Sequence, residues 1–116
     1  MVTAVVRSLD THKAQDIAVL QVSNVTPIAD YFVIASATSH TGVRALVDYV
    51  DTDLSKVQVS PLRTEGYGSA QWVLLDYGTV VVHVFLDSAR AFYDLERLWQ
   101  DAETLDPALF LEDEES

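Results

Sequence analysis

Residues 72–85 read Trp72-Val-Leu-Leu-Asp-Tyr-Gly-Thr-Val-Val-Val-His-Val-Phe85, and this stretch decides the fold of the chain. Two apolar runs flank Gly78-Thr79, which is the pattern of two antiparallel strands joined by a two-residue turn. We expect Tyr77 to pair with Val80 across the turn, because alternation then places like side chains on the same face. One face holds only core-type residues, namely Val73, Leu75, Tyr77, Val80, Val82 and Val84.

The opposite face of the predicted hairpin, which we call the mixed face, combines several chemical types. It holds Trp72, Leu74, Asp76, Val81, His83 and Phe85. Burial alone does not require a carboxylate and an imidazole beside aromatic rings. Protein interfaces favour aromatic anchors surrounded by polar groups, so the mixed face is the candidate for function. The structural alternative is a helix that covers Trp72 and Phe85, and such a helix would remove this assignment.

Periodicity outside the hairpin predicts an α/β (α+β) fold. Apolar spacing indicates helices near residues 2–14 and 39–57, with Thr38 or Ser39 as the cap of the second helix. Strands are expected at 16–23, at 30–36 and in a short form at 60–65. A helix between strands requires a crossover, whereas the hairpin is antiparallel, so we expect one mixed sheet of about five strands with packed helices.

The last predicted helix runs from residue 88 to about residue 103. Its apolar stripe consists of Phe92, Leu95, Leu98, Trp99 and Ala102. Arg90 and Asp94 are four residues apart, which is the spacing of an ion pair on the solvent face of a helix.

Composition indicates one compact domain. The chain has 116 residues, of which 49% are hydrophobic, with 4 Gly and 3 Pro. We place the domain at residues 1–107 and an acidic, flexible tail at 108–116. No cysteine occurs, which excludes disulfides and thiolate chemistry. Neither a secretion signal nor a membrane-spanning run is recognisable, so we expect a cytoplasmic protein without a membrane partner.

The charge balance favours a basic protein as partner. The chain carries 18 Asp plus Glu against 7 Lys plus Arg, which gives a formal net charge of -11. Its basic residues are scattered singly, whereas binding to a phosphate backbone relies on clustered basic side chains. We therefore expect little direct nucleic-acid binding.

The sequence offers weak support for catalysis. Asp76 and His83 are diagonal neighbours in the predicted register, but Ser69 lies outside any nucleophile-elbow motif. His12, His40 and His83 lack the paired spacing of a metal site. We expect no catalytic residue, no metal and no cofactor.

Five segments, in order, resemble one protein family. They are Asp30-Tyr-Phe-Val-Ile, Glu65-Gly66, Trp72-Val-Leu-Leu-Asp-Tyr-Gly78, Val81-Val-His-Val-Phe85 and Arg90-Ala-Phe-Tyr-Asp-Leu-Glu-Arg-Leu-Trp99. Over roughly residues 1–105 the chain resembles the ribosomal silencing factors, also called Iojap-like proteins or RsfS. The resemblance implies a fold similar to nucleotidyltransferases and a binding role without catalysis. Such proteins bind the fourteenth protein of the large ribosomal subunit, block association with the small subunit and repress translation under nutrient limitation.

The resemblance and the mixed face together nominate a partner-binding site. Its residues are Trp72, Leu74, Asp76, Tyr77, His83, Phe85 and Glu65. Two places depart from the family pattern: Thr79 stands where Asp commonly follows Tyr-Gly, and Ser39-His-Thr-Gly-Val43 replaces an Arg-Gln start of the helix. The resemblance leaves homodimer formation open.

The alternative function is that of a nucleotidyltransferase-like enzyme or a nucleotide-binding protein. It is suggested by Gly68-Ser69 ahead of Asp76 and by the implied fold. Such chemistry needs clustered carboxylates that hold metal ions at the phosphates, yet the position two residues after Asp76 is Gly78.

Overall fold

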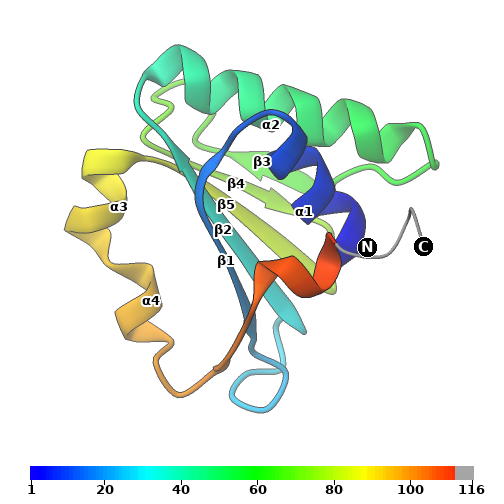
Figure 1. Cartoon of the computed structure of the whole chain (residues 1–116), viewed down its shortest axis with the longest axis vertical. Helices are drawn as coiled ribbons and strands as arrows, with labels where there is room; N and C mark the ends of the chain where they lie inside the picture. The colour runs from blue at the N-terminus through cyan, green and yellow to red at the C-terminus, as the bar shows by residue number, and fades with distance from the viewer. Residues whose placement is uncertain (112–116) are drawn as a thin grey trace.

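A computed structural model of the chain describes residues 1–111, which form one mixed sheet with helices on both faces (Figure 1). The elements in this range are α1 (Val2–Thr11), β1 (Gln15–Gln21), β2 (Tyr31–Ala37), α2 (His40–Ser55), β3 (Arg63–Glu65), β4 (Trp72–Asp76), β5 (Val80–Leu86), α3 (Asp87–Tyr93), α4 (Leu95–Leu98), β6 (Glu103–Leu105) and the 3-10 helix η1 (Pro107–Phe110). The predicted α/β (α+β) class is confirmed.

The sheet has the strand order β3-β4-β5-β2-β1-β6 within the part of the chain that is described. Strands β2 and β5 are parallel, and the other neighbours are antiparallel. This arrangement confirms the predicted mixed sheet. The prediction of about five strands missed β6, a three-residue edge strand that pairs with β1. So short a segment carries too little alternation to be recognised.

The hairpin has the predicted register. The backbone N–H of Tyr77 donates to the carbonyl of Val80 at 2.9 Å, and Trp72 lies opposite Phe85. All six predicted core residues of the hairpin are buried against α1 and α2. Both helices contribute apolar stripes as predicted, consisting of Val2, Val5, Val6 and Leu9 from α1 and of Val43, Leu46, Val47, Val50 and Leu54 from α2. Val57, the last predicted member of the second stripe, lies beyond the end of α2 and is exposed.

Helix α2 begins at a side-chain cap. The Oγ atom of Ser39 accepts a hydrogen bond from the backbone N–H of Gly42 at 2.9 Å, so Ser39 and not Thr38 is the cap. The helix ends at Ser55, two residues before the predicted end, and α1 ends at Thr11 rather than near residue 14.

We expect the free energy of unfolding of the Ser39→Ala variant to be about 1 kcal/mol lower than that of the wild type, because one backbone N–H of the first helical turn loses its acceptor. Thr38→Ala is the matched control and should leave stability almost unchanged. Urea unfolding monitored by circular dichroism measures both values, and equal losses in the two variants would contradict the assignment of the cap.

The prediction of one continuous helix over residues 88–103 is wrong. Asp94 has a φ of 49°, and this left-handed residue separates α3 from the four-residue helix α4. Aspartate tolerates the left-handed region better than most residues do. The reversal breaks the predicted stripe, since Leu95 is 5% exposed whereas Phe92 and Leu98 are 80% and 75% exposed.

The predicted ion pair between Arg90 and Asp94 is also wrong. The guanidinium of Arg90 binds both carboxylate oxygens of Glu96, at 3.2 and 2.9 Å, and donates to Ser36 Oγ at 3.3 Å. The break at Asp94 brings Glu96 back over α3, so this bond joins the two short helices and ties them to β2. The segment after the break therefore has a defined position on the sheet.

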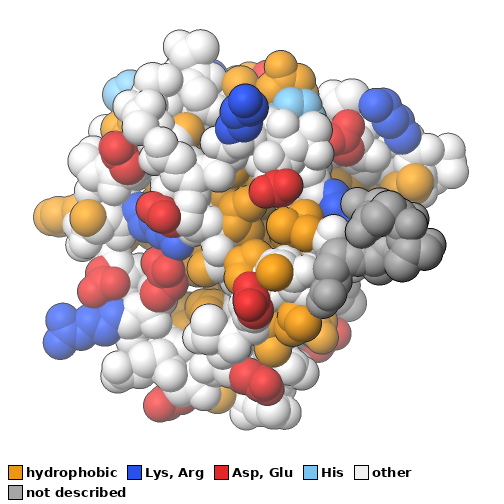
Figure 2. All heavy atoms as spheres, viewed as in Figure 1, with side chains coloured by type: hydrophobic (Ala, Val, Ile, Leu, Met, Phe, Trp, Pro, Cys, Tyr) orange, Lys and Arg blue, Asp and Glu red, His pale blue; other side chains and the backbone are white. Residues whose placement is uncertain are grey.

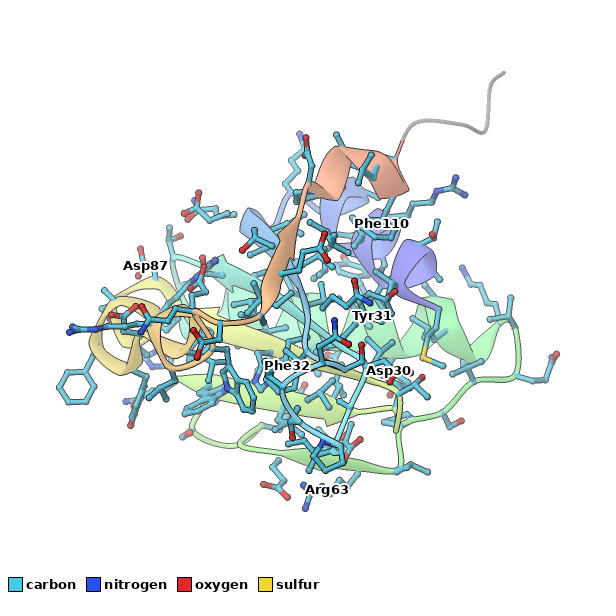
Figure 3. All side chains as sticks on the ribbon, turned by 90° about the horizontal axis from the view of Figure 1, so that it is seen from below. Asp30, Tyr31, Phe32, Arg63, Asp87 and Phe110 are labelled. Atoms are coloured by element: carbon cyan, nitrogen blue, oxygen red, sulfur yellow. The ribbon has the colours of Figure 1, made fainter. Side chains whose placement is uncertain are left out.

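The described chain stays packed beyond residue 107. Phe110 and Leu111 lie against the core that α1 covers (Figure 3). Of the predicted acidic tail at 108–116, residues 112–116 lie outside the described residues, and the domain boundary at 107 stays a prediction. Within residues 1–111, no helix has the length and apolar character needed to cross a membrane.

Candidate partner-binding site

The mixed face of the hairpin is partly covered and partly open. Phe85 and His83 are buried, whereas Trp72, Leu74 and Asp76 are partly exposed. The Trp72 ring stacks on Phe85 with a centroid distance of 4.9 Å and meets Tyr93 of α3 at 5.1 Å. Helix α3 therefore covers the Phe85 end of this face without closing over Trp72.

The seven nominated residues thus divide into two groups. The first group has side chains at the surface: Trp72, Leu74 and Asp76 are partly exposed and Glu65 is exposed, and pairing of β3 with β4 places Glu65 opposite Leu74. Tyr77, His83 and Phe85 are buried in the isolated chain. Tyr77 lies on the core face, as the alternation itself requires, and burial raises its pKa to about 12. A direct contact of these three with a partner stays a prediction.

A hydrogen bond joins the two polar aromatic side chains of the mixed face. The indole Nε1–H of Trp72 donates to Nδ1 of His83 at 3.0 Å. Indole nitrogen can only donate, so Nδ1 is the acceptor and the imidazole proton of neutral His83 resides on Nε2. Burial lowers the pKa of His83 to about 4, which keeps the ring neutral at ordinary pH. A buried neutral imidazole thus fixes the orientation of Trp72.

Asp76 belongs to the hairpin turn and to the edge strand. Its Oδ1 atom accepts from the N–H of Gly78 at 2.8 Å, and its Oδ2 atom accepts from Arg63 Nε at 3.2 Å. Arg63 also pairs with Glu65 at 2.9 Å. Asp76 and His83 are the predicted diagonal neighbours, but Asp76 bonds to Gly78 and Arg63, and His83 bonds to Trp72. In the described part of the chain, no group of three or more His, Cys, Asp and Glu is placed to hold a metal ion.

The loop before β4 places Trp72 at the surface. Gly66 has a φ of 84°, and a Cβ atom there would lie 2.2 Å from the carbonyl oxygen of Trp72. Only glycine permits this close approach of the two backbone segments. Arg44 of α2 holds the loop by donating to the carbonyls of Tyr67 and Gly68 at 3.1 and 2.6 Å.

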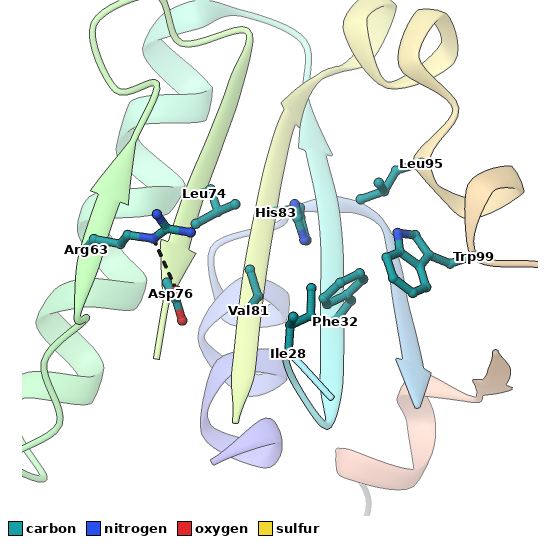
Figure 4. A pocket seen from close by; sticks show the side chains of 9 residues that line it. All are labelled: Ile28, Phe32, Arg63, Leu74, Asp76, Val81, His83, Leu95 and Trp99. Atoms are coloured by element: carbon teal, nitrogen blue, oxygen red, sulfur yellow. Dashed lines mark hydrogen bonds and ion pairs between the residues drawn. The ribbon is translucent and has the colours of Figure 1, made fainter. Parts of the chain in front are cut away.

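Two hollows share Leu74 as a lining residue. The first, about 300 Å³, is lined by Glu65, Gly66, Trp72 and Leu74. The second, about 310 Å³, is called the His83 pocket (Figure 4). Its apolar walls are Ile28, Phe32, Leu74, Val81, Leu95 and Trp99. Arg63 and Asp76 lie at one side of this pocket, and His83 contributes the remaining wall.

Sequence reasoning missed several walls of the His83 pocket. Phe32 reaches it because β2 is the parallel neighbour of β5, which places Phe32 beside Val81. Trp99 reaches it after the break at Asp94 and meets Phe32 edge-to-face at 5.1 Å. Alternation alone puts Phe32 on a strand face, but it does not identify the neighbouring strand.

Acidic side chains are spread over the face of the molecule that Figure 2 shows. In the view of Figure 2 they surround an apolar centre, and the few Lys and Arg side chains stand apart from one another. This distribution agrees with the formal net charge of -11. A protein with such a field attracts basic partners and repels polyanions.

Fold and site together define a small α+β protein with a partly exposed aromatic and acidic face beside an apolar pocket. The chain belongs to the ribosomal silencing factor (RsfS) family, because the family described as "Ribosomal silencing factor during starvation" matches residues 1–116. The resemblance noted in the sequence is thereby confirmed.

Individual relatives agree with this assignment. The ribosomal silencing factor RsfS of Halalkalibacterium halodurans is 39% identical over 101 residues, which are 87% of this chain and 86% of that protein. The mouse "Mitochondrial assembly of ribosomal large subunit protein 1" is 36% identical over 94 residues, which are 78% of this chain and 41% of that protein. A crystal structure of a Chromobacterium violaceum protein has a TM-score of 0.81 and 36% identity, covering 84% of this chain and 81% of that one.

Proposed function

We propose that this chain binds the large ribosomal subunit through its fourteenth protein, blocks association with the small subunit and so represses translation under nutrient limitation. The observation that carries the proposal is the family match along the full length of the chain. The names of the two relatives state roles in ribosome silencing and in large-subunit assembly, and neither states a reaction.

The exposed part of the mixed face supports binding to a protein. Trp72 supplies a large aromatic side chain that is already held by His83 and Phe85, so little side-chain entropy is lost on binding. Leu74 adds apolar surface, and the carboxylates of Asp76 and Glu65 border it. Aromatic anchors with a polar rim are typical of interface centres.

The charge of the chain supports a basic contact on the subunit. With a formal net charge of -11, the chain would be repelled by exposed ribosomal RNA. A basic ribosomal protein offers the complementary field, and long-range attraction raises the association rate. We therefore expect binding to weaken as the salt concentration rises.

The test is sedimentation of the purified chain with isolated large subunits. We expect the chain to pellet with large subunits and to reduce the amount of joined ribosomes when small subunits are added. Subunits in which the exposed surface of the fourteenth protein is altered should no longer bind. Equal binding to altered and unaltered subunits would show a different contact, and absence of pelleting would refute the proposal.

A further inference from the structure

The first hollow of the candidate site exists because the edge strand leaves the sheet beside Trp72. We call it the Trp72 hollow, and its lining residues are Glu65, Gly66, Trp72 and Leu74. Residue 65 of β3 pairs with residue 74 of β4, so continuation of this register would place residue 67 opposite Trp72. The chain turns away at Gly66 instead, and the Tyr67 hydroxyl donates to Asp48 of α2, which packs on the core face of the sheet. Among residues 1–111, Trp72 therefore has no cross-strand neighbour on the β3 side, and the space left there is about 300 Å³.

The charge beside the Trp72 hollow is negative. Arg63 pairs with two carboxylates, those of Glu65 at 2.9 Å and of Asp76 at 3.2 Å, and Figure 4 shows the second pair. Since two carboxylates share one guanidinium, one negative charge is left over. None of the described residues that line the hollow is basic. The Arg63 and Glu65 side chains are 61% and 57% exposed, and such exposed pairs contribute little to stability, so Glu65 can turn towards an incoming cation at low cost.

The Trp72 ring offers an aromatic surface rather than a hydrogen bond. Its Nε1–H already donates to His83 at 3.0 Å, so the indole has no donor left for a partner. Aromatic rings attract cations, and tryptophan does so most strongly. An aromatic ring, a leucine and a carboxylate together suit a basic side chain, whose aliphatic stem packs on Trp72 and Leu74 while its charge meets Glu65. A guanidinium is the best match, because it stacks on rings and donates two parallel hydrogen bonds to a carboxylate.

The charge of the chain favours a basic protein over a second copy as the source of this side chain. Two copies would each carry a formal net charge of -11 and would repel one another. A basic ribosomal protein has the complementary field. We propose that the Trp72 hollow receives a basic side chain of the bound ribosomal protein, held between the Trp72 ring and the Glu65 carboxylate, a contact that rests on the proposed function.

Neutralisation of Glu65 tests the contact on the ribosome. We expect Glu65→Gln to weaken sedimentation with large subunits about tenfold in Kd, because the carboxylate is lost while the size of the side chain is kept. Glu103→Gln is the matched control, since Glu103 is an exposed strand residue of β6 at the opposite edge of the sheet. It removes the same charge from the chain and should bind within about twofold of wild type, because solvent ions screen so distant a charge. Equal losses in the two variants, or no loss in either, would overturn the proposal.

A double-mutant cycle identifies the basic side chain of the partner. The exposed Arg and Lys residues of the fourteenth protein are replaced by Gln one at a time, and each altered subunit is sedimented with wild type and with Glu65→Gln. One replacement should weaken binding of the wild type about tenfold and leave the affinity of Glu65→Gln almost unchanged, since the two side chains act as a pair. Additive losses at every replaced position would contradict the contact.

A free probe tests the Trp72 hollow without the ribosome. N-acetyl-arginine amide is compared at equal ionic strength with N-acetyl-citrulline amide, which has a similar shape but no charge. We expect the arginine probe to shift the indole N–H resonance of Trp72 saturably in the ¹⁵N-labelled chain, and to shift that of Trp99, which lines the His83 pocket, much less. The citrulline probe should bind wild type at least about tenfold more weakly, as should the arginine probe to Glu65→Gln. Equal affinities of the two probes, or no saturable shift, would overturn the proposal.

The two readouts distinguish failure of this contact from failure of the proposed function. If wild type pellets with large subunits and Glu65→Gln binds equally well, the contact is refuted and the proposed function stands. If wild type binds the arginine probe but does not pellet, the hollow is supported as a cation site and the ribosomal protein is refuted as its source. Self-association of wild type that Glu65→Gln abolishes would place a second copy at the hollow and overturn the choice of partner.

Discussion

Acidification from neutral pH to about pH 4 is expected to remove about 3 kcal/mol of folding stability through His83 alone. The pKa of this imidazole is about 4 in the folded chain and 6.5 as a free group. Between these values the unfolded chain binds a proton that the folded chain does not bind. The contribution of His83 is therefore complete above pH 6.5 and is lost as the pH falls towards 4.

The pH range in which stability is lost distinguishes His83 from the carboxylates. The Asp53 carboxyl accepts a hydrogen bond from Ser8, which lowers its pKa below its ordinary value of 3.8, so its contribution is lost at still lower pH. Urea unfolding at a series of pH values measures the effect. In His83→Phe, the free energy of unfolding should no longer fall between neutral pH and about pH 4. It should still fall below pH 4, where Asp53 becomes protonated. An equal slope in both proteins would show that His83 is not the group responsible.

The fold was largely predictable because its strongest signals are local. Period-two alternation and the Gly78-Thr79 turn set the register of the hairpin, and helical spacing set the stripes of α1 and α2. The break at Asp94 was not predictable in this way, since the residues around it include neither Gly nor Pro. Arg90 binds Glu96 across that break. The four-residue spacing had predicted an ion pair of Arg90 with Asp94, but the bond to Glu96 forms instead.

The site was predictable only in part, because its exposure and its walls depend on tertiary contacts that local sequence patterns do not show. Alternation correctly grouped Trp72, Leu74 and Asp76, but exposure of this face depends on what α3 and α4 cover. Phe85 was equally attractive in the sequence and is fully buried in the structure. The His83 pocket combines walls from β2, β5 and the segment after Asp94, and no local pattern shows that these segments meet.

The variant Trp72→Ala is expected to lose at least about 2 kcal/mol of binding free energy for large subunits, which is about 30-fold in Kd. The indole is held in place before binding by His83 Nδ1 and by stacking on Phe85, so truncation removes a pre-organised anchor. Trp72 lies outside the core that α1 and α2 cover, so the variant should fold. Circular dichroism checks that point before sedimentation is measured.

Phe92→Ala is the matched control for this loss. Phe92 is also a large aromatic residue and is 80% exposed, but it belongs to α3 and lies outside the mixed face. Its removal should leave sedimentation with large subunits unchanged. Trp72→Phe keeps a ring that can stack on Phe85 but loses the donor to His83, so its affinity should lie between those of wild type and Trp72→Ala. Sedimentation of Trp72→Ala at the wild-type level would exclude Trp72 as the anchor, whereas equal losses in Trp72→Ala and Phe92→Ala would indicate that the partner contacts α3 as well.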